Sequence, residues 1–212
     1  MLKKLFWQDP YQTDLTTHVT SVQGQQITVA ETIFYAFSGG QESDTGTIDG
    51  WRVVQARNEG FEIVYTLESE HGLHVGDAVT MRIDWDRRYR LMRLHFAAEI
   101  ILELVNQTLP GIQKIGAHIA QDKSRIDFEW GENLSKLFPM LHEKSAALIQ
   151  ANHPIISAYS DEENQRRYWE IEGFARVACG GTHLRSTGEV GKLELRRKNV
   201  GKGKERIEIT VE

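Results

Sequence analysis

Cysteine is nearly absent from this sequence, since Cys179 is the only one among 212 residues. A single thiol cannot form an internal disulfide, so nothing requires an oxidising compartment. The sequence also lacks an apolar run of ~18 residues, which excludes a membrane-spanning helix. The segment MLKKLFWQDPYQTD has no apolar stretch after its lysines, so we expect no secretory signal. These absences predict a cytoplasmic protein without a membrane partner.

An excess of positive charge is absent as well. The chain has 25 basic and 30 acidic residues, a net charge of −5, which does not indicate a DNA-binding protein. Two segments depart from this balance: residues 82–93 carry five basic and two acidic side chains, and residues 192–206 carry seven and two. A solvated surface of mixed charge is the simpler interpretation. An RNA-binding surface would require both segments to share one face.

The first 85 residues have the composition of β-strands. SVQGQQITVAETIFYAF is rich in β-branched and aromatic residues, and WRVVQARNEGFEIVYTLE predicts a hairpin around residues 58–60. A further strand is expected after Gly76 and Asp77. Short strands at this spacing predict a small barrel or sandwich over residues 1–85.

The pattern changes near residue 85, where we place the boundary to a second domain, residues 86–212. Apolar residues recur at helical spacing from Leu91 to Val105, with Asp86 as the expected N-cap and Pro110 as the stop. A hairpin, a second helix broken near Pro139 and three strands, FARVAC, KLELRRKN and ERIEITVE, are expected to follow. The overall class is therefore α+β.

Two pairs of side chains could supply metal ligands. His95 and Glu99 are four residues apart on the predicted helix and therefore share one face. Cys179 and His183 have the same spacing in a glycine-rich segment. Together they offer imidazole, carboxylate and thiolate groups, a mixture that zinc accepts in tetrahedral geometry. Spacing alone also fits a buried structural cysteine and an ordinary hydrogen-bonded His–Glu pair.

Four segments resemble one known family. CGGTHLRSTGEVG resembles the zinc-binding segment of alanyl-tRNA synthetase editing domains and of the free-standing AlaX deacylases. TIFYAFSGGQESDTGTI resembles the glycine-rich motif of the β-barrel that precedes their editing domain. VGDAVTMRIDWDRRYRLMRLH resembles the approach to their zinc helix, and RKNVGKGKERIEI resembles their closing strand. The order matches over nearly the whole chain, most closely the medium-length AlaX type, and the aminoacylation domain is absent.

This resemblance implies a small β-barrel domain followed by an α+β zinc-binding editing domain. It also implies a zinc-dependent aminoacyl-tRNA deacylase that hydrolyses, in trans, tRNA(Ala) mischarged with serine, with glycine as a second candidate. One zinc ion would be held by His95, Cys179 and His183. The family writes H-x-x-x-H on the helix, whereas this chain writes HFAAE, so Glu99 replaces the second histidine.

The replacement leaves three interpretations open. In the first, Glu99 is the fourth zinc ligand through oxygen. In the second, zinc keeps three protein ligands and a water, and Glu99 is the catalytic general base. In the third, the site has lost its activity. Two alternative functions follow from these. One is a catalytically degenerate AlaX-like tRNA-binding protein, and the other is a metallohydrolase that acts on another aminoacyl ester.

The resemblance also assigns substrate and RNA contacts. In the family the glycine-rich loop contributes to serine selectivity, which brings in Gly39, Gly40 and Gln41, although a tight turn alone would explain the two glycines. Thr182 is a candidate catalytic and substrate-binding residue because it stands beside His183. The expected RNA-binding residues are Arg196, Arg197, Lys198, Lys202 and Lys204.

Overall fold

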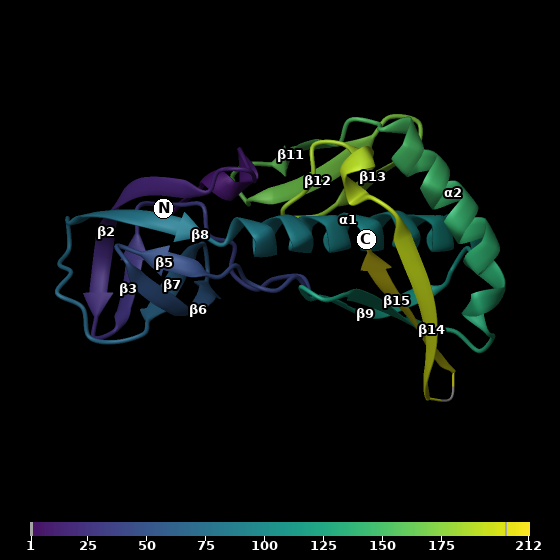
Figure 1. Ribbon diagram of the computed structural model, residues 1–212, viewed down its shortest axis with the longest axis horizontal. Coiled ribbons are helices and arrows are strands. Elements are labelled where there is room, and N and C mark those ends of the chain that lie inside the picture. Colours follow the sequence, from purple (N-terminus) through teal and green to yellow (C-terminus); the bar gives the residue numbers. More distant parts are fainter. Residues whose placement is uncertain (1, 202) are drawn as a thin grey trace. The chain divides into compact units, whose positions relative to one another are not determined.

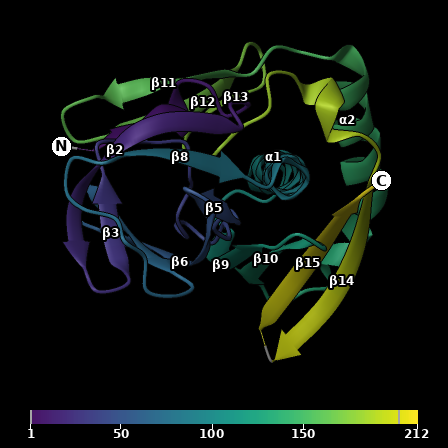
Figure 2. The same ribbon diagram turned by 60° about the vertical axis from the view of Figure 1, so that its left-hand side comes forward.

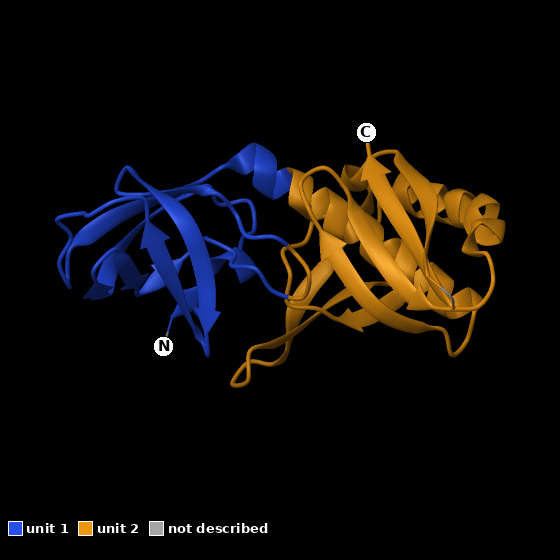
Figure 3. Ribbon diagram, turned by 90° about the horizontal axis from the view of Figure 1, so that it is seen from below, with its two compact units in different colours: residues 1–38, 42–89 blue, residues 39–41, 90–212 orange. Residues whose placement is uncertain are grey.

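The computed structural model describes residues 2–201 and 203–212. The chain divides into two compact units, residues 1–38 with 42–89 and residues 39–41 with 90–212 (Figure 3). The division falls four residues beyond the boundary that the pattern change suggested, inside a continuous helix. The short segment Gly39–Gln41 belongs to the second unit.

The first unit is built from short strands. Six of them form a closed barrel in the order β2-β3-β7-β6-β5-β8. Side chains along β7 alternate between the core and the outer face of the sheet: Ile63, Tyr65 and Leu67 point into the core and are fully buried. The elements of this unit are β1 (Lys3–Lys4), η1 (Leu5–Trp7), β2 (Asp14–Gln23), β3 (Gln26–Val29), β4 (Glu31–Thr32), β5 (Gly46–Ile48), β6 (Trp51–Glu59), β7 (Glu62–Leu67) and β8 (Ala78–Ile83).

The long predicted helix is present as α1 (Trp85–Thr108). Its N-cap is Asp84, whose carboxylate accepts from the Arg87 backbone N–H at 3.1 Å. The expectation that Asp86 caps the helix was therefore wrong, because Trp85 is already helical and Asp86 lies in the first turn. The predicted apolar stripe is buried, and so is the opposite side of the helix, which carries Phe96 and Ile100.

That burial follows from two sheets of the second unit, which enclose α1 from both sides (Figures 1 and 2). One sheet has the order β14-β15-β10-β9 and the other β11-β12-β13. The elements of this unit are β9 (Gln113–Ile119), β10 (Ser124–Glu129), η2 (Leu134–Leu137), α2 (Phe138–Ala151), β11 (Ile156–Asp161), β12 (Arg166–Ile171), β13 (Ala175–Ala178), η3 (Thr187–Val190), β14 (Leu193–Gly201) and β15 (Lys204–Val211).

The α+β class is confirmed by this architecture. The break near Pro139 is also present, since a 3-10 turn precedes α2 and the proline occupies its first turn. Strands β11 and β12 were not predicted from the sequence. They complete the sheet over α1 that leads into the loop of Cys179.

Candidate metal centre

The first half of the candidate site lies on α1. His95 and Glu99 are one helical turn apart, and His95 Nε2 lies 3.2 Å from Glu99 Oε1. Their side chains are 7% and 14% exposed, so the pair is almost removed from water. The His95 ring contacts the sulfur of Cys179, the residue after β13, so this face of α1 turns toward the β11-β12-β13 sheet, which Figures 1 and 2 show on one side of the helix.

The second half lies in the loop after β13. The backbone N–H of Cys179 donates to the carbonyl of Arg167 at 3.0 Å and thereby continues the β12–β13 pairing up to the cysteine. Cys179 Sγ then lies 3.5 Å from His95 Nε2 and 3.3 Å from His183 Nε2. One ligand atom each from His95, Cys179 and His183 lies within 4.8 Å of the others.

These distances fit a tetrahedral zinc ion. Bonds of ~2.3 Å to sulfur and ~2.0–2.1 Å to nitrogen or oxygen separate neighbouring ligand atoms by about 3.3–3.6 Å. The three contacts that join Glu99, His95, Cys179 and His183 in sequence measure 3.2, 3.5 and 3.3 Å. Glu99 contacts the same nitrogen of His95 that faces the sulfur, whereas the group whose ligand atoms all lie within 4.8 Å of one another consists of His95, Cys179 and His183.

Two neighbours orient the imidazole rings. Ser157 Oγ lies 2.9 Å from His183 Nδ1, so it can fix the tautomer that leaves Nε2 for a metal. Gly181 packs directly against the other ring: a Cβ there would stand 2.1 Å from His95 Cε1 and 2.7 Å from Nδ1. His95 Nδ1 is buried and has no hydrogen-bond partner among the residues that the structure describes. The ring is therefore held by packing against Gly181 on this side and by the contacts of Nε2 with Glu99 and Cys179 on the other.

Charges in the metal-free cluster are strongly coupled. Burial disfavours the imidazolium of His95, but the Cys179 sulfur and the Glu99 carboxylate outweigh it and raise the pKa of His95 to about 10. Burial also opposes ionisation of Glu99, whereas the hydrogen bond and charge of His95 lower the pKa of Glu99 to about 2. Burial and repulsion by His95 lower the pKa of His183 to about 3. His183 is thus neutral at pH 7, the form that binds metals.

The glycine-rich loop reaches this centre through Gln41. Gly40 has a φ of +90°, and a Cβ there would lie 2.5 Å from the carbonyl oxygen of Ala117, so the loop can pack on β9 only with glycine at this position. Gly39 has a φ of +59° with open space around it. The amide of Gln41 then forms two bonds with Thr182, donating to Oγ1 at 2.9 Å and accepting from the backbone N–H at 3.3 Å. Both side chains are buried.

The predicted RNA-binding residues do not all share one face. Arg196, Lys198 and Lys204 are exposed, whereas Arg197 points to the opposite side of β14 and pairs with the buried carboxylate of Glu205 at 2.5 Å. Lys202 lies outside the described residues.

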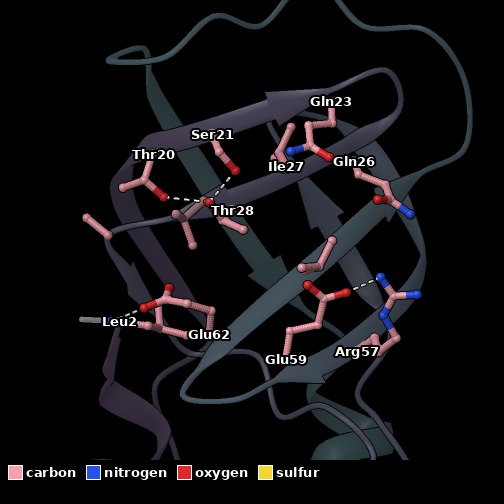
Figure 4. A pocket seen from close by; sticks show the side chains of 13 residues that line it. Leu2, Thr20, Ser21, Gln23, Gln26, Ile27, Thr28, Arg57, Glu59 and Glu62 are labelled. Carbon is pink, nitrogen blue, oxygen red and sulfur yellow. Dashed lines mark hydrogen bonds and ion pairs between the residues drawn. The ribbon is translucent and has the colours of Figure 1, made fainter.

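A cavity of about 650 Å³ lies in the first unit, between the hairpins of β2–β3 and β6–β7 (Figure 4). Several of its polar side chains pair with one another: the hydroxyl of Thr28 lies 2.7 Å from those of Thr20 and Ser21, and Arg57 pairs with Glu59. None of the predicted site residues lines this cavity.

Comparison with known proteins identifies the family of the chain. Residues 6–87 match the family described as tRNA synthetases class II (A), and residues 167–208 match the threonyl and alanyl tRNA synthetase second additional domain. The alanyl-tRNA editing protein AlaX-M of Pyrococcus horikoshii is 32% identical over 224 residues, covering 100% of this chain and 99% of the relative. The chain belongs to the AlaX-M family.

A second AlaX-M, from Methanosarcina mazei, is 32% identical over 98% of this chain and 95% of its own length. The alanine–tRNA ligase of Ignicoccus hospitalis is 32% identical over 91% of this chain, which corresponds to 24% of that protein. The family resemblance indicated by the motifs is confirmed. Cys179, Thr182 and His183 lie within the matched additional domain, and His95 and Glu99 lie between the two matched segments.

Sequence reasoning missed two residues of this AlaX-M site. Ser157 and Arg167 come from β11 and β12, the strands that were not predicted. Arg167 is buried, its guanidinium lies over the Tyr159 ring at 4.5 Å, and its charge acts on both Cys179 and His183. The alternation of buried Arg167, Trp169 and Ile171 was the available signal. Among the described residues, no helix is both long and apolar enough to cross a membrane.

Proposed function

We propose that this chain is a cytoplasmic, zinc-dependent deacylase that hydrolyses tRNA(Ala) mischarged with serine. The observation that carries the proposal is the convergence of His95, Cys179 and His183 on one point, with ligand atoms within 4.8 Å of one another. Membership of the alanyl-tRNA editing family supports the substrate class. An aminoacyl ester is already activated, so the site has only to position a water and stabilise a tetrahedral oxyanion.

His95, Cys179 and His183 would hold the zinc, with Glu99 as the fourth ligand. When bound, zinc supplies a Lewis acid that polarises an ester carbonyl or acidifies a water. Glu99 contacts His95 Nε2, the nitrogen that also faces the sulfur of Cys179. This contact supports a role for Glu99 as a zinc ligand over a role as a general base outside the ligand set. One thiolate and one carboxylate would also balance the charge of the ion, which favours a stable buried centre.

Thr182 and Gln41 would select serine. Because Thr182 Oγ1 accepts the Gln41 amide hydrogen, the threonine hydroxyl keeps its own hydrogen for donation to a substrate oxygen. A serine side chain offers that oxygen, and alanine does not. A site built to hydrogen-bond a substrate hydroxyl can reject the analogue that lacks it by as much as ~10⁴-fold. Gly39 and Gly40 would contribute by allowing the loop to place Gln41.

A panel of charged tRNAs tests the proposed function. We expect rapid hydrolysis of Ser-tRNA(Ala) with Ala-tRNA(Ala) spared. Gly-tRNA(Ala) is the second candidate substrate, and because glycine also lacks the hydroxyl, its hydrolysis would show that the contact with Thr182 is not the only basis of selection. Binding without hydrolysis of any of them would identify a catalytically degenerate homologue. Hydrolysis of unrelated aminoacyl esters at a comparable rate would instead identify a broader metallohydrolase.

The Glu99→Gln variant separates the roles of that residue. As a fourth ligand, Glu99 is needed for the metal, so we expect the variant to lose both bound zinc and turnover. Zinc content from plasma mass spectrometry and single-turnover hydrolysis give the two readouts. A variant that keeps one zinc per chain but loses turnover would contradict the ligand role and identify Glu99 as the general base.

A further inference from the structure

Three side chains form one row across the face of the β11-β12-β13 sheet that meets α1. Strand register places Tyr159 of β11 opposite Arg167 of β12, and the backbone N–H of Cys179 donates to the carbonyl of Arg167 from the other side. Residues directly opposite each other on neighbouring strands direct their side chains to the same face, with Cβ atoms about 4.5–5.5 Å apart. Trp169, two residues further along β12, packs on Phe96 of α1 with ring centroids 5.2 Å apart, so the row faces the helix.

The middle of this row is a buried cation. Arg167 is 6% exposed, and its guanidinium lies over the Tyr159 ring, 4.5 Å from the centroid. Its charge interacts with the oxygen of Tyr159 and the sulfur of Cys179. With its candidate ligands, zinc would form a neutral centre, because the thiolate of Cys179 and the carboxylate of Glu99 balance its two charges. Arg167 places a fixed positive charge beside that centre, since arginine stays protonated in proteins.

The ends of the row are open to solvent although its middle is not. Tyr159 and Cys179 are half-buried, and Ser157, the previous residue of β11 on the same face, is exposed. Ser157 also lies 2.9 Å from His183 Nδ1, so this solvent-facing part of the sheet is directly beside a candidate ligand. A substrate that approaches the ligands from here comes close to the guanidinium of Arg167, whose N–H groups form a planar fork for anionic oxygen.

We propose that Arg167 is a further catalytic residue, whose guanidinium donates hydrogen bonds to the oxyanion that forms from the ester carbonyl of mischarged tRNA. The inference rests on the proposed function, which supplies the ester. Attack of a water oxygen on the carbonyl carbon moves the π electron pair onto the carbonyl oxygen, and Arg167 binds the resulting negative charge. When that pair returns, the bond to the ribose oxygen breaks. One proton of the water passes to the ribose oxygen, and the other leaves as the serine carboxyl group ionises.

The test is hydrolysis of Ser-tRNA(Ala) by the variant Arg167→Gln. Because the negative charge develops only in the transition state, loss of one oxyanion donor should lower kcat by about 10²–10³-fold and leave KM within about twofold. Arg167→Lys keeps the charge without the planar fork, so we expect it to regain part of the lost rate. A raised KM with an unchanged kcat in Arg167→Gln would overturn the proposal, because it would identify a contact with the ground-state substrate, such as a tRNA phosphate.

Two substrate analogues give a readout without turnover. An adenosine that carries serine through a 3′-amide has a planar, neutral carbonyl, whereas a phosphonate at the same position has a tetrahedral, anionic centre that resembles the oxyanion. We expect Arg167→Gln to bind the phosphonate at least about 100-fold more weakly than the wild type does and to bind the amide equally well. Calorimetry measures both affinities. Equal losses for the two analogues, or no loss for either, would overturn the proposal.

The matched control is Arg176→Gln. Arg176 lies over the Tyr168 ring at 3.7 Å in the same sheet, but its side chain is 56% exposed and pairs with Glu170. We expect this variant to keep the wild-type kcat, KM and affinity for both analogues.

A second neutral variant, Arg167→Met, guards against misfolding of the glutamine variant, because methionine still packs on the Tyr159 ring. We expect it to bind one zinc per chain and to show the same loss of kcat. A folded, zinc-loaded Arg167→Met with the wild-type kcat would overturn the role of Arg167.

The same measurements separate this inference from the proposed function. A wild-type protein that hydrolyses none of the charged tRNAs would refute the proposed function and, with it, the role of Arg167. Hydrolysis by the wild type together with an unchanged kcat in the Arg167 variants would refute only the role of Arg167.

Discussion

Replacement of Gly181 by alanine should disable the metal centre through steric contact alone. The added Cβ would lie 2.1 Å from His95 Cε1 and 2.8 Å from Gln41 Oε1. Ordinary carbon–carbon contacts are ~3.5–4.0 Å, so the ring or the loop must move by about 1.4 Å. A ligand nitrogen displaced that far no longer bonds to zinc at ~2.0–2.1 Å.

The expected magnitudes follow from this displacement. Overpacking of a filled site costs about 1–3 kcal/mol of folding stability. Loss of an outer partner of a metal ligand already weakens metal binding by about 10–100-fold, so displacement of the ligand itself should cost at least about 100-fold. Competition with a chromophoric chelator measures zinc affinity, and denaturant unfolding of the metal-free protein measures the stability change.

Gly131→Ala is the matched control. A Cβ at Gly131 meets nothing within 4 Å, and its φ is not in the left-handed region. We expect this variant to bind zinc and hydrolyse Ser-tRNA(Ala) as the wild type does. Retention of wild-type zinc affinity by Gly181→Ala would refute the reasoning, because it would mean that His95 is not a ligand in the position described.

Two further predictions follow from the same site. Thr182→Val keeps the shape of the side chain but leaves the Gln41 amide buried without its acceptor. We expect this variant to lose about 1–3 kcal/mol of folding stability and to show a lower ratio of kcat/KM for Ser-tRNA(Ala) over Ala-tRNA(Ala). An unchanged ratio would mean that Thr182 does not contribute to selectivity. Zinc binding must displace the proton of His95, whose pKa in the metal-free protein is about 10, so zinc affinity should rise about tenfold per pH unit from about pH 7 to 9. Calorimetry in buffers of different ionisation enthalpy measures the released proton, and an affinity independent of pH would contradict the assignment.

Local pattern was sufficient to predict α1, because a long apolar repeat at helical spacing is typical of a helix packed on a core. The prediction stopped at one stripe and did not use the apolar Phe96 side of α1, which is also buried and is the signal that the helix is enclosed by two sheets. The strands β11 and β12 were missed because the charged run between Ser160 and Glu172 is typical of a solvated surface. Arg167 faces the interior there, which is rare for an arginine.

Prediction of the site was limited in the same way, because local sequence does not indicate long-range contacts. The motif around Cys179 predicted two ligands, Cys179 and His183, and the helical spacing predicted that His95 and Glu99 share a face. The bond between Gln41 and Thr182 joins residues 141 positions apart, and no local signal encodes such a distance. Ser157 likewise becomes relevant only once its strand lies beside His183. The family resemblance therefore predicted the candidate ligands, whereas the side chains that contact them became known only from the fold.

We propose that one zinc ion, held by His95, Glu99, Cys179 and His183, is required to deacylate Ser-tRNA(Ala). The most direct measurement is a zinc titration of chelator-stripped protein, with the initial rate of Ser-tRNA(Ala) hydrolysis as the readout. We expect no hydrolysis at the start and a linear rise that ends sharply at one equivalent of zinc, with Ala-tRNA(Ala) spared throughout. Full hydrolysis by the stripped protein, or a rate that does not respond to zinc, would contradict it.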